Sequence, residues 1–322
     1  MANTTRTQIP AEVTDIYDRT LLDRVTPLLP HGQWAQIRDI PRNAGTKQIN
    51  FRRYSNLAAA TTPLAEGVTP AGKQLSVTKV YAIVAQYGDF VTVTDILTYE
   101  SADPILMETA EILGDQAALT LDTLTRDIMV AGSNVRYANA VVGRTSLTAG
   151  VDLPDEADFD AAILTLKNGL AMKMTKMVNP DTGYNTHPVR PCYIGICHVN
   201  TTPILEKMNR FIPVEKYANK ADVMEGEVGT YRDIRFIETT NAKVFTGGGA
   251  GGADVYATMI LGMHAYGKTR VSGEALKNIV KPLGSGGTED PLDQRATSGW
   301  KATYVAKILN DSFITRVEHV IS

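Results

Sequence analysis

The chain has 322 residues, of which 43% are hydrophobic and 21% are charged, and its formal net charge is −3. This is ordinary globular composition, and the chain is long enough for two structural units with their own cores. A protein that mainly grips DNA through its phosphates usually carries a strong basic excess, so that class is disfavoured, although a local basic patch is still allowed.

The sequence shows no sign of export or of membrane insertion. Only two cysteines occur, Cys192 and Cys197, so no disulfide framework is expected and a reducing compartment is favoured. The opening stretch MANTTRTQIPAEV lacks the basic and apolar regions of a secretory signal. No apolar run approaches the roughly 18–20 residues that span a bilayer. These features predict a soluble intracellular protein.

Residues 1–48 carry few signals of regular structure. The stretch TDIYDRTLLDRVTPLL predicts one short amphipathic helix, whose apolar side is formed by Ile16, Leu21, Leu22 and Val25. Prolines punctuate the chain around it, and such a terminal segment is ordered only when something holds it. We therefore predict an N-terminal arm.

Residues 49–94 predict an extended loop. Two stretches with apolar alternation, KQINFRRY and QLSVTKVYAIVAQYGDFVTVTDI, flank a small polar segment that is rich in turn residues. The second strand is unusually long, and its apolar side chains of one parity are Leu75, Val77, Tyr81, Ile83, Val91 and Val93. Because a lone two-stranded hairpin is at best marginally stable in water, a second layer is needed. Either its own domain or a neighbouring copy must supply that layer.

The stretch DPILMETAEILGDQAALTLDTLTRDIMVAG predicts a long helix over residues 103–131. Its apolar residues recur at spacings of three and four, Ser101 or Asp103 can cap its start with Pro104 in the first turn, and Gly132 can end it. A helix of about 28 residues is more than twice the usual length, which suits a spine across which a sheet is laid.

Further along the chain, helices and strands are predicted in separate blocks. A second helix is predicted in DEADFDAAILTLKNGLAMK, with an apolar stripe of Phe159, Ile163, Leu166 and Leu170. Short strands follow at CYIGIC, IRFIET and VYATMILG, and TTPILEKMNRF predicts a short helix capped by Thr202. Long strands return at LKNIVKPLG, WKATYVAKIL and FITRVEHVIS. Because βαβ alternation is missing, the predicted fold class is α+β.

A search for catalytic, metal and nucleotide sites finds no convincing candidate. The stretch GGGAGG at residues 247–252 joins two strands and lacks the helix that follows a phosphate loop, so a mobile hairpin tip is predicted. If CYIGIC is a strand, Cys192 and Cys197 lie roughly 16 Å apart and point to opposite faces, so they share neither zinc nor a disulfide. The acidic run that begins at Asp152 lacks EF-hand spacing and is expected to enter a helix N-terminus. We predict no enzyme, no metal and no cofactor.

The order of the predicted elements resembles the major capsid proteins of tailed bacteriophages. The resemblance is carried by YGDFVTVTDILTYE, by EGEVGTYRDIRFIETTNA and by DPLDQRATSGWKATYVAKILNDSFITRVEH, and it is nearest to the N4-like, short-tailed branch. It implies the Hong Kong-type capsid fold with five parts. These are an N-terminal arm (1–48), an extended two-stranded loop (49–94), a peripheral domain (95–186) with the spine helix, an axial domain (187–268) and return strands of the peripheral domain (269–322).

The same resemblance implies a structural virion protein. Copies would form pentamers and hexamers in the host bacterial cytoplasm and close an icosahedral shell around double-stranded DNA, which they would contact non-specifically. Portal, scaffolding and decoration proteins are implied partners, and a membrane is not. Two alternatives stay open: an encapsulin-type compartment shell, and a soluble enzyme with a site among the central strands.

Two further expectations concern particular side chains. Candidates for ion pairs between subunits lie on the extended loop, and a solvated face is an equally good interpretation of them: Arg52, Arg53, Glu66 and Lys73. The resemblance also implies that the C-terminal strands lie beside the spine helix. In that arrangement Trp300, Tyr304 and Ile308 would face the helix, and Lys301, Thr303 and Lys307 would face away from it.

Overall fold

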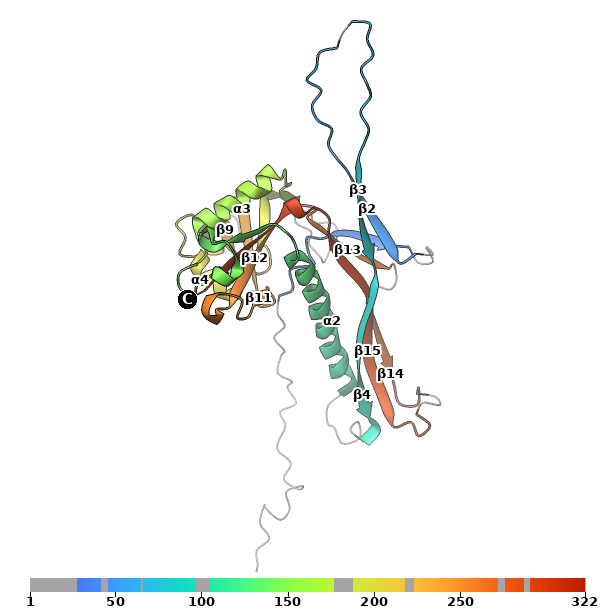
Figure 1. Ribbon diagram of the computed structural model, residues 1–322. Helices are drawn as coiled ribbons and strands as arrows, with labels where there is room; N and C mark the ends of the chain where they lie inside the picture. The colour runs from blue at the N-terminus through green and yellow to red at the C-terminus, as the bar shows by residue number, and fades with distance from the viewer. Residues whose placement is uncertain are drawn as a thin grey trace, which may run out of the picture.

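The computed structural model describes residues 28–41, 46–64, 66–96, 105–176, 188–217, 223–271, 276–286 and 290–321. These residues form two lobes and a projecting ribbon (Figure 1). One lobe is built on a five-stranded sheet, the other on a nine-stranded sheet, and the ribbon is a two-stranded sheet of its own. Among the described strands most pairings are antiparallel, with three parallel exceptions, and helices and strands do not alternate regularly, so the predicted α+β class is confirmed.

The five-stranded sheet is centred on β15 (Arg295–Ile308), a strand of 14 residues. One edge of β15 pairs with β4 (Ala85–Thr94), and the other edge pairs with β14 (Lys277–Lys281) and then with β13 (Tyr266–Val271). β1 (Gln36–Ile40) extends the sheet as the parallel partner of β13. Part of the predicted arm is therefore built into this sheet.

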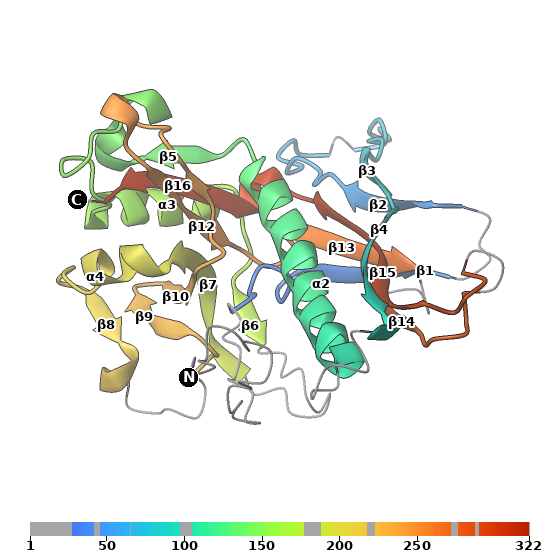
Figure 2. The ribbon, with the colours of Figure 1, turned by 90° about the horizontal axis from the view of Figure 1, so that it is seen from below.

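The helix α2 (Ile105–Val130) crosses one face of this sheet, as Figure 2 shows from below. Its residues Leu113 and Ala117, from the predicted apolar stripe, are buried against the sheet. At its end, the amide of Gly132 donates to the carbonyl of Met129, as expected of a glycine that closes a helix. The proposed caps at 101–104 lie outside the described residues.

The face of β15 that the sequence assigns to the helix does contact it. Trp300 packs in one cluster with residues of α2, and its Nε1 donates to Oε1 of Gln116 at 3.0 Å. The hydroxyl of Tyr304 lies 2.6 Å from Oγ1 of Thr125. Ile308 packs against the cluster that contains Met129 at the end of α2. The predicted parity of this strand is confirmed.

The opposite face of β15 carries Lys301, Thr303 and Lys307, which point away from the helix as predicted. Lys301 and Lys307 are exposed there, whereas Thr303 is buried. Its Oγ1 accepts a hydrogen bond from the amide of Val271 at 3.3 Å, because the pairing of β13 with β15 ends at Thr269 and the end of β13 lies next to Thr303.

The second lobe is a nine-stranded sheet. Its order is β5 (Val135–Tyr137), β16 (Ile314–Val320), β12 (Val255–Leu261), β7 (Pro188–His198), β10 (Ile234–Thr239), β9 (Glu227–Tyr231) and β8 (Phe211–Pro213), with β11 (Val244–Phe245) beside β12 and β6 (Met174–Lys176) beside β7. The helix α3 (Glu156–Asn168) covers one face, and Met129 of α2 joins the apolar cluster on the other. The core of the lobe therefore lies on both faces of the sheet.

The two cysteines confirm that β7 is buried on both faces. Cys197 belongs to the apolar cluster on the α3 face, Cys192 belongs to the cluster on the opposite face, and neither forms a disulfide. The predicted geometry, in which they share neither a metal nor a disulfide, follows from this odd spacing along one strand.

The position of β16 corrects one expectation. The sequence predicts the last strand beside the spine helix, but this strand lies between β5 and β12 in the nine-stranded sheet. A short turn at Asp311–Phe313 redirects the chain, and the amides of Leu309 and Asn310 both donate to the carbonyl of Ala265 there. All seven residues of β16 are buried, which a strand in the middle of a sheet covered on both faces allows.

Helix α3 also departs from the predicted pattern. It lies in the second lobe, although the predicted boundaries grouped it with the spine helix, and it ends at Asn168. Leu170 is predicted on the apolar stripe of this helix, but it has φ of 56° and is 71% exposed. The reason is that the chain turns at Gly169, where a Cβ would lie 2.8 Å from the carbonyl oxygen of Ser312. At the other end, Asp155 and Asp158 form a capping box, so the acidic run begins a helix as predicted.

The short helix α4 (Thr202–Leu205) starts one residue earlier than expected. Thr201 occupies the cap position, and the hydroxyl of Thr202 donates instead to Oε2 of Glu238 at 2.8 Å. The glycine-rich stretch joins β11 to the antiparallel β12, as predicted for a hairpin. The backbone of this tip is tied down, since the amide of Ala250 donates to the carbonyl of Leu147 at 2.7 Å.

The ribbon consists of β2 (Gln48–Tyr54) and β3 (Val77–Ile83), which pair antiparallel and extend away from both lobes (Figure 1). The predicted second strand is not continuous. It breaks at the buried Val84, whose amide donates to the carbonyl of Lys47, and β4 then pairs with β15. One stretch of alternating apolar residues thus forms strands in two sheets. Its first part pairs with β2, and after Val84 its second part pairs with β15.

Candidate assembly surfaces

The ribbon has one covered face and one uncovered face. Ala82 is buried, and Phe51 and Val80 on the same face are half-buried. On the other face, large side chains stay exposed to solvent: Tyr54 at 61%, Val77 at 38%, Tyr81 at 53% and Ile83 at 64%. We call these four residues the outer stripe. It contains three of the side chains that the sequence predicts to need a second layer, and the described part of the chain leaves them without one.

Beyond the ribbon, residues 55–64 and 66–76 are irregular and carry further exposed apolar side chains. Among them, Leu64 is 77% exposed and Leu75 is 67% exposed. The legs of the loop are joined by a bond from the amide of Ser55 to the carbonyl of Ser76, and by one from Nζ of Lys73 to the carbonyl of Ala58 at 3.1 Å. Several large apolar side chains exposed on one projecting segment indicate an interaction surface.

The predicted interface residues lie on this ribbon and loop, but the structure does not bring them together. Arg52 is directly opposite Lys79 in the ladder, Arg53 is opposite Thr78, and Glu66 is exposed on the loop. Within the described residues, none of the four candidates forms an ion pair. Residues 48–83 contain four basic side chains and one acidic side chain, so the ribbon is basic although the chain is acidic. Like charges directly opposite each other are unfavourable in a ladder unless another group compensates them.

A shallow groove of about 660 Å³, which sequence reasoning missed, lies on the sheet face that points away from α2. Phe90 and Ile279 form its apolar part, Lys281 and Lys301 lie along it, and Gly88 is at its floor. The strands are close there, since a Cβ on Gly88 would lie 2.6 Å from the carbonyl oxygen of Trp300. A glycine inside a long strand is the one sequence signal that could have drawn attention to this place.

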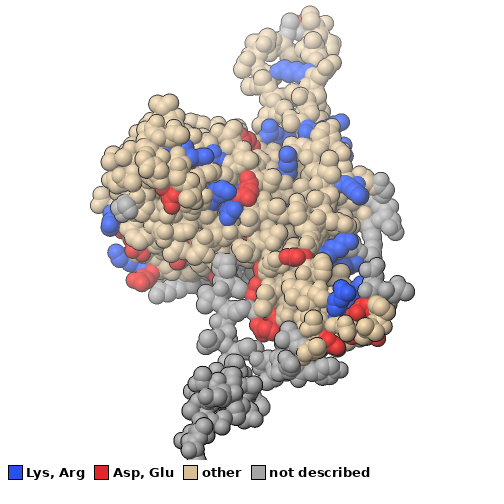
Figure 3. Space-filling view, turned by 60° about the horizontal axis from the view of Figure 1, so that its bottom comes forward, with Lys and Arg blue, Asp and Glu red and all other residues tan. Residues whose placement is uncertain are grey.

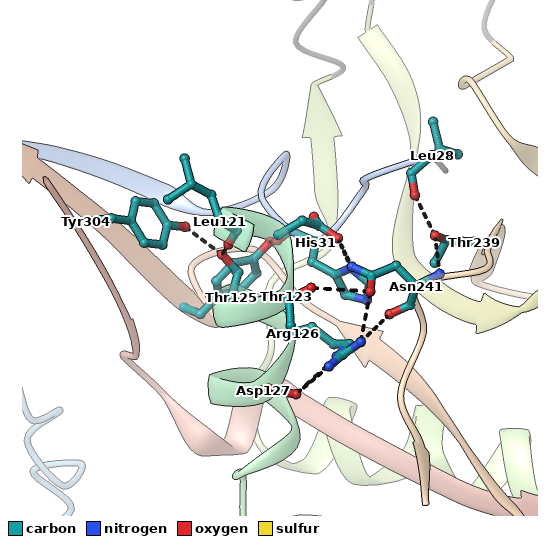
Figure 4. A network of polar contacts seen from close by, with 12 residues as sticks. Leu28, His31, Leu121, Thr123, Thr125, Arg126, Asp127, Thr239, Asn241 and Tyr304 are labelled. Atoms are coloured by element: carbon teal, nitrogen blue, oxygen red, sulfur yellow. Dashed lines mark hydrogen bonds and ion pairs between the residues drawn. The ribbon is translucent and has the colours of Figure 1, made fainter. Parts of the chain in front are cut away.

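The root of the N-terminal arm is fixed where the two lobes meet (Figure 4). The hydroxyl of Thr239 donates to the carbonyl of Leu28, that of Tyr266 donates to the carbonyl of His31, and Nζ of Lys268 donates to the carbonyl of Gly32 at 2.8 Å. Burial, and next the nearby charge of Arg270, lower the pKa of Lys268. Residues 28–34 therefore connect β10 of one sheet to β13 of the other.

A polar network continues from this root onto the spine helix (Figure 4). Nδ1 of His31 lies 2.7 Å from Oδ2 of Asp122, and the same oxygen accepts from Nδ2 of Asn241 at 2.8 Å. Arg126, one turn further along α2, donates to the carbonyl and the side-chain oxygen of Asn241. The expectation that something holds the arm is met for residues 28–40, whereas the predicted helix with Ile16 and Leu21 lies outside the described residues.

Within the described ranges, no group of three or more His, Cys, Asp or Glu side chains is placed to hold a metal ion. No helix in the same ranges is long and apolar enough to cross a membrane.

Comparison with known proteins points to one class. No family model matches the chain. The major capsid protein of Pseudomonas phage KPP21 is 28% identical over 136 residues, which is 39% of this chain and 33% of that protein. The chain thus matches about a third of the length of this curated relative.

Solved structures match over almost the whole chain. The capsid of Ralstonia phage GP4 has a TM-score of 0.68 at 11% identity, covering 100% of this chain and 99% of that one. The capsid of cyanophage P-SCSP1u has a TM-score of 0.67 at 12% identity, with 100% and 97% covered, and the capsid of cyanophage Pam1 has 0.66 at 14%, with 99% of each covered.

At these identities the likeness establishes the fold. The chain has the Hong Kong-type fold of tailed-phage capsid proteins, which confirms the fold predicted from the sequence and the resemblance from which it came. The narrower resemblance to the N4-like branch stays a prediction.

Proposed function

We propose that this chain is the major capsid protein of a tailed bacteriophage, and that its copies form pentamers and hexamers of an icosahedral shell around double-stranded DNA. The observation that carries the proposal is the ribbon, which holds an exposed apolar stripe away from both lobes. The capsid fold and the capsid relative described above support it. Within that fold, we assign the lobe of α2 and β15 to the peripheral domain and the nine-stranded lobe to the axial domain.

In this function the ribbon of one copy lies on a sister copy. The sister covers the outer stripe, and its acidic groups compensate Arg52 and Lys79, which face each other on the ribbon. Identical copies joined head to tail close into rings when the rotation between them allows it. Each contact is weak, but many simultaneous contacts give a stable shell through multivalency.

The remaining partners follow from the same resemblance. We propose that the shell is assembled in the host cytoplasm and ends in the virion, with portal, scaffolding and, where present, decoration proteins as partners and with non-specific contact to the packaged DNA. A compartment shell shares the fold and differs in its cargo. The contents of purified particles therefore distinguish the two.

Electron microscopy of the expressed chain tests the proposal. We expect rings of capsomer size or closed shells in negative stain, and nuclease-protected DNA inside particles made during infection. A chain that stays monomeric at high concentration and turns over small molecules is the result expected of the enzyme alternative, and it would end the capsid proposal. Shells filled with a specific host protein would favour the compartment.

Deleting the loop tip from Ala58 to Gly72 tests the role of the ribbon. We expect a soluble, folded chain that does not form closed shells, because Figure 1 shows the described part of this tip at the far end of the ribbon, away from both lobes. A matched variant, in which the same 15 positions of the printed sequence are replaced by glycine and serine, keeps the reach of the loop but removes its apolar side chains. Normal particles from the deletion would show that the ribbon has no part in closure.

A further inference from the structure

Three cationic side chains surround one aromatic ring on the nine-stranded lobe. The guanidinium carbon of Arg144 lies 3.4 Å from the centroid of the Phe245 ring, Nζ of Lys243 lies at 5.8 Å and the guanidinium carbon of Arg316 at 6.0 Å. We call Arg144, Lys243 and Arg316 the basic cluster. They come from three parts of the chain: the short helix at Arg144–Ser146, the residue before β11, and β16.

The carboxylate within the cluster does not neutralise it. Glu318 is fully buried and accepts two bonds of 2.7 Å from Nε and Nη2 of Arg144 and one of 2.6 Å from Nε of Arg316. The hydrogen bond to Glu318 raises the pKa of Arg144, so its guanidinium stays charged. Two of the three cations, Arg144 and Arg316, thus share one inner carboxylate. The next acid, Asp127, reaches Lys243 from the rim at 3.3 Å and is itself 48% exposed.

The cluster keeps unused donors. Nη1 of Arg316 is buried and has no hydrogen-bond partner among the described residues. Nη1 of Arg144 takes no part in the bonds to Glu318, and the side chains of Arg144 and Lys243 are 31% and 29% exposed. Cations whose N–H groups are partly open to solvent, in a setting with excess positive charge, are suited to bind an anion.

The position of the cluster is fixed by strand alternation. Val317 packs in the cluster on the α3 face, so Arg316 and Glu318 on either side of it point to the opposite face. Lys243 reaches Asp127 on α2, which places the basic cluster on the side of the lobe next to the spine helix. In Figure 3, Lys and Arg side chains gather over this lobe near its junction with the other one.

We propose that the basic cluster contacts the sugar–phosphate backbone of the DNA inside the shell. The proposal rests on the proposed capsid function, and it names the face of the subunit that is turned toward the DNA. Guanidinium and ammonium groups bind phosphate oxygens without reading sequence. An acidic peptide would need apolar anchors as well, and the ring of Phe245 lies beneath the cations instead of forming a pocket. One subunit binds DNA weakly, but the many copies in a shell bind the same DNA at once, so their combined binding is strong.

Fluorescence anisotropy tests this proposal. It measures how tightly the full chain binds a short DNA duplex of random sequence at several salt concentrations. We choose Lys243→Glu, because Lys243 does not contact the buried Glu318, and Lys243→Gln as a milder second variant. The matched control is Lys167→Glu on α3, since Lys167 also forms an exposed ion pair with an aspartate, Asp233, at 2.8 Å. It lies on the other face of the sheet.

We expect Lys243→Glu to weaken duplex binding about threefold to tenfold at about 50 mM salt and to lower the slope of log affinity against log salt by about 0.9 per lost phosphate contact. Lys167→Glu should match the unchanged chain. Equal binding by both variants, or no duplex binding by the unchanged chain, would overturn the proposal. The proposal would also be overturned if poly-glutamate binding depended on Lys243 and duplex binding did not. The basic cluster would then fit an acidic polypeptide.

The two proposals can fail separately. If empty shells form normally and duplex binding ignores Lys243, the capsid function stands and the basic cluster has another role. If the chain never forms shells but its duplex binding depends on Lys243, the cluster binds DNA in some other context.

Discussion

His31 and Asp122 are 91 positions apart in the chain and are joined by a 2.7 Å contact between Nδ1 and Oδ2, with side chains 1% and 4% exposed. This contact ties the root of the N-terminal arm to the middle of the spine helix. Because Asn241 shares the same carboxylate oxygen, the arm, the helix and the nine-stranded sheet meet at a single side chain.

We therefore expect Asp122→Ala to destabilise the fold by about 3 kcal/mol, because it leaves the buried His31 and the Asn241 amide without their shared partner. Asp127→Ala is the matched control, since Asp127 is on the same helix but is 48% exposed. It should change the free energy of unfolding by less than about 0.5 kcal/mol. Urea unfolding measures both. Equal effects would show that the His31–Asp122 contact adds nothing to stability.

A second prediction concerns pH. Burial lowers the pKa of His319 from 6.5 to about 4, and the nearby His198 acts in the same direction. The unfolded chain therefore binds more protons between these two values, so stability is complete above about pH 6.5 and is lost as the pH falls toward 4. The loss from this group is of the order of 3 kcal/mol.

His319→Gln should reduce this acid sensitivity, because glutamine does not titrate and can still reach the Thr258 hydroxyl, which lies 3.1 Å from Nε2 of His319. Urea unfolding at neutral pH and near pH 5 gives the comparison. The prediction is wrong if the unchanged chain and the variant lose the same stability on acidification.

The cysteines give a third prediction. Both are buried, and burial raises the pKa of Cys197 to about 12, so its thiolate is scarce at any ordinary pH. We expect neither Cys192 nor Cys197 to react with a thiol reagent in the folded chain, and both to react once urea unfolds it. Fast labelling of either thiol under native conditions would mean that β7 is more open than its burial indicates.

A fourth prediction separates subunit stability from assembly. Because Arg52 faces Lys79 across the ribbon, Arg52→Glu creates a cross-strand ion pair and should leave the subunit as stable or stabilise it by about 0.2–1 kcal/mol. The same change removes a cation that we propose faces acidic groups on a sister copy, so shells should form more slowly or not at all. Arg52→Lys, which keeps the charge, is the control.

Light scattering during assembly, together with urea unfolding of the subunit, reads out both effects. Normal assembly by Arg52→Glu would leave Arg52 as a solvated residue, the interpretation that the sequence allowed equally.

Several local features could be predicted from the sequence because they depend on periodicity. The spacing of Leu113 and Ala117 marked the buried stripe of α2, and the parity of Trp300 and Tyr304 marked the helix-facing side of β15. The odd spacing of the two cysteines placed them on opposite faces of one strand. The side of a helix or strand to which a side chain points follows from the position of the residue in the helical or strand repeat.

Which segments of the chain pack or pair with one another was decided by the tertiary structure alone. Periodicity cannot say that the chain changes sheets at Val84, that β16 joins the nine-stranded sheet, or that Asp122 meets His31. It also cannot gather Arg144, Lys243 and Arg316 around one ring. Each of these depends on contacts between segments far apart in the chain, where loop closure and burial of whole surfaces determine which segments meet. Local sequence determines which way a side chain points, and only the folded chain determines what lies opposite it.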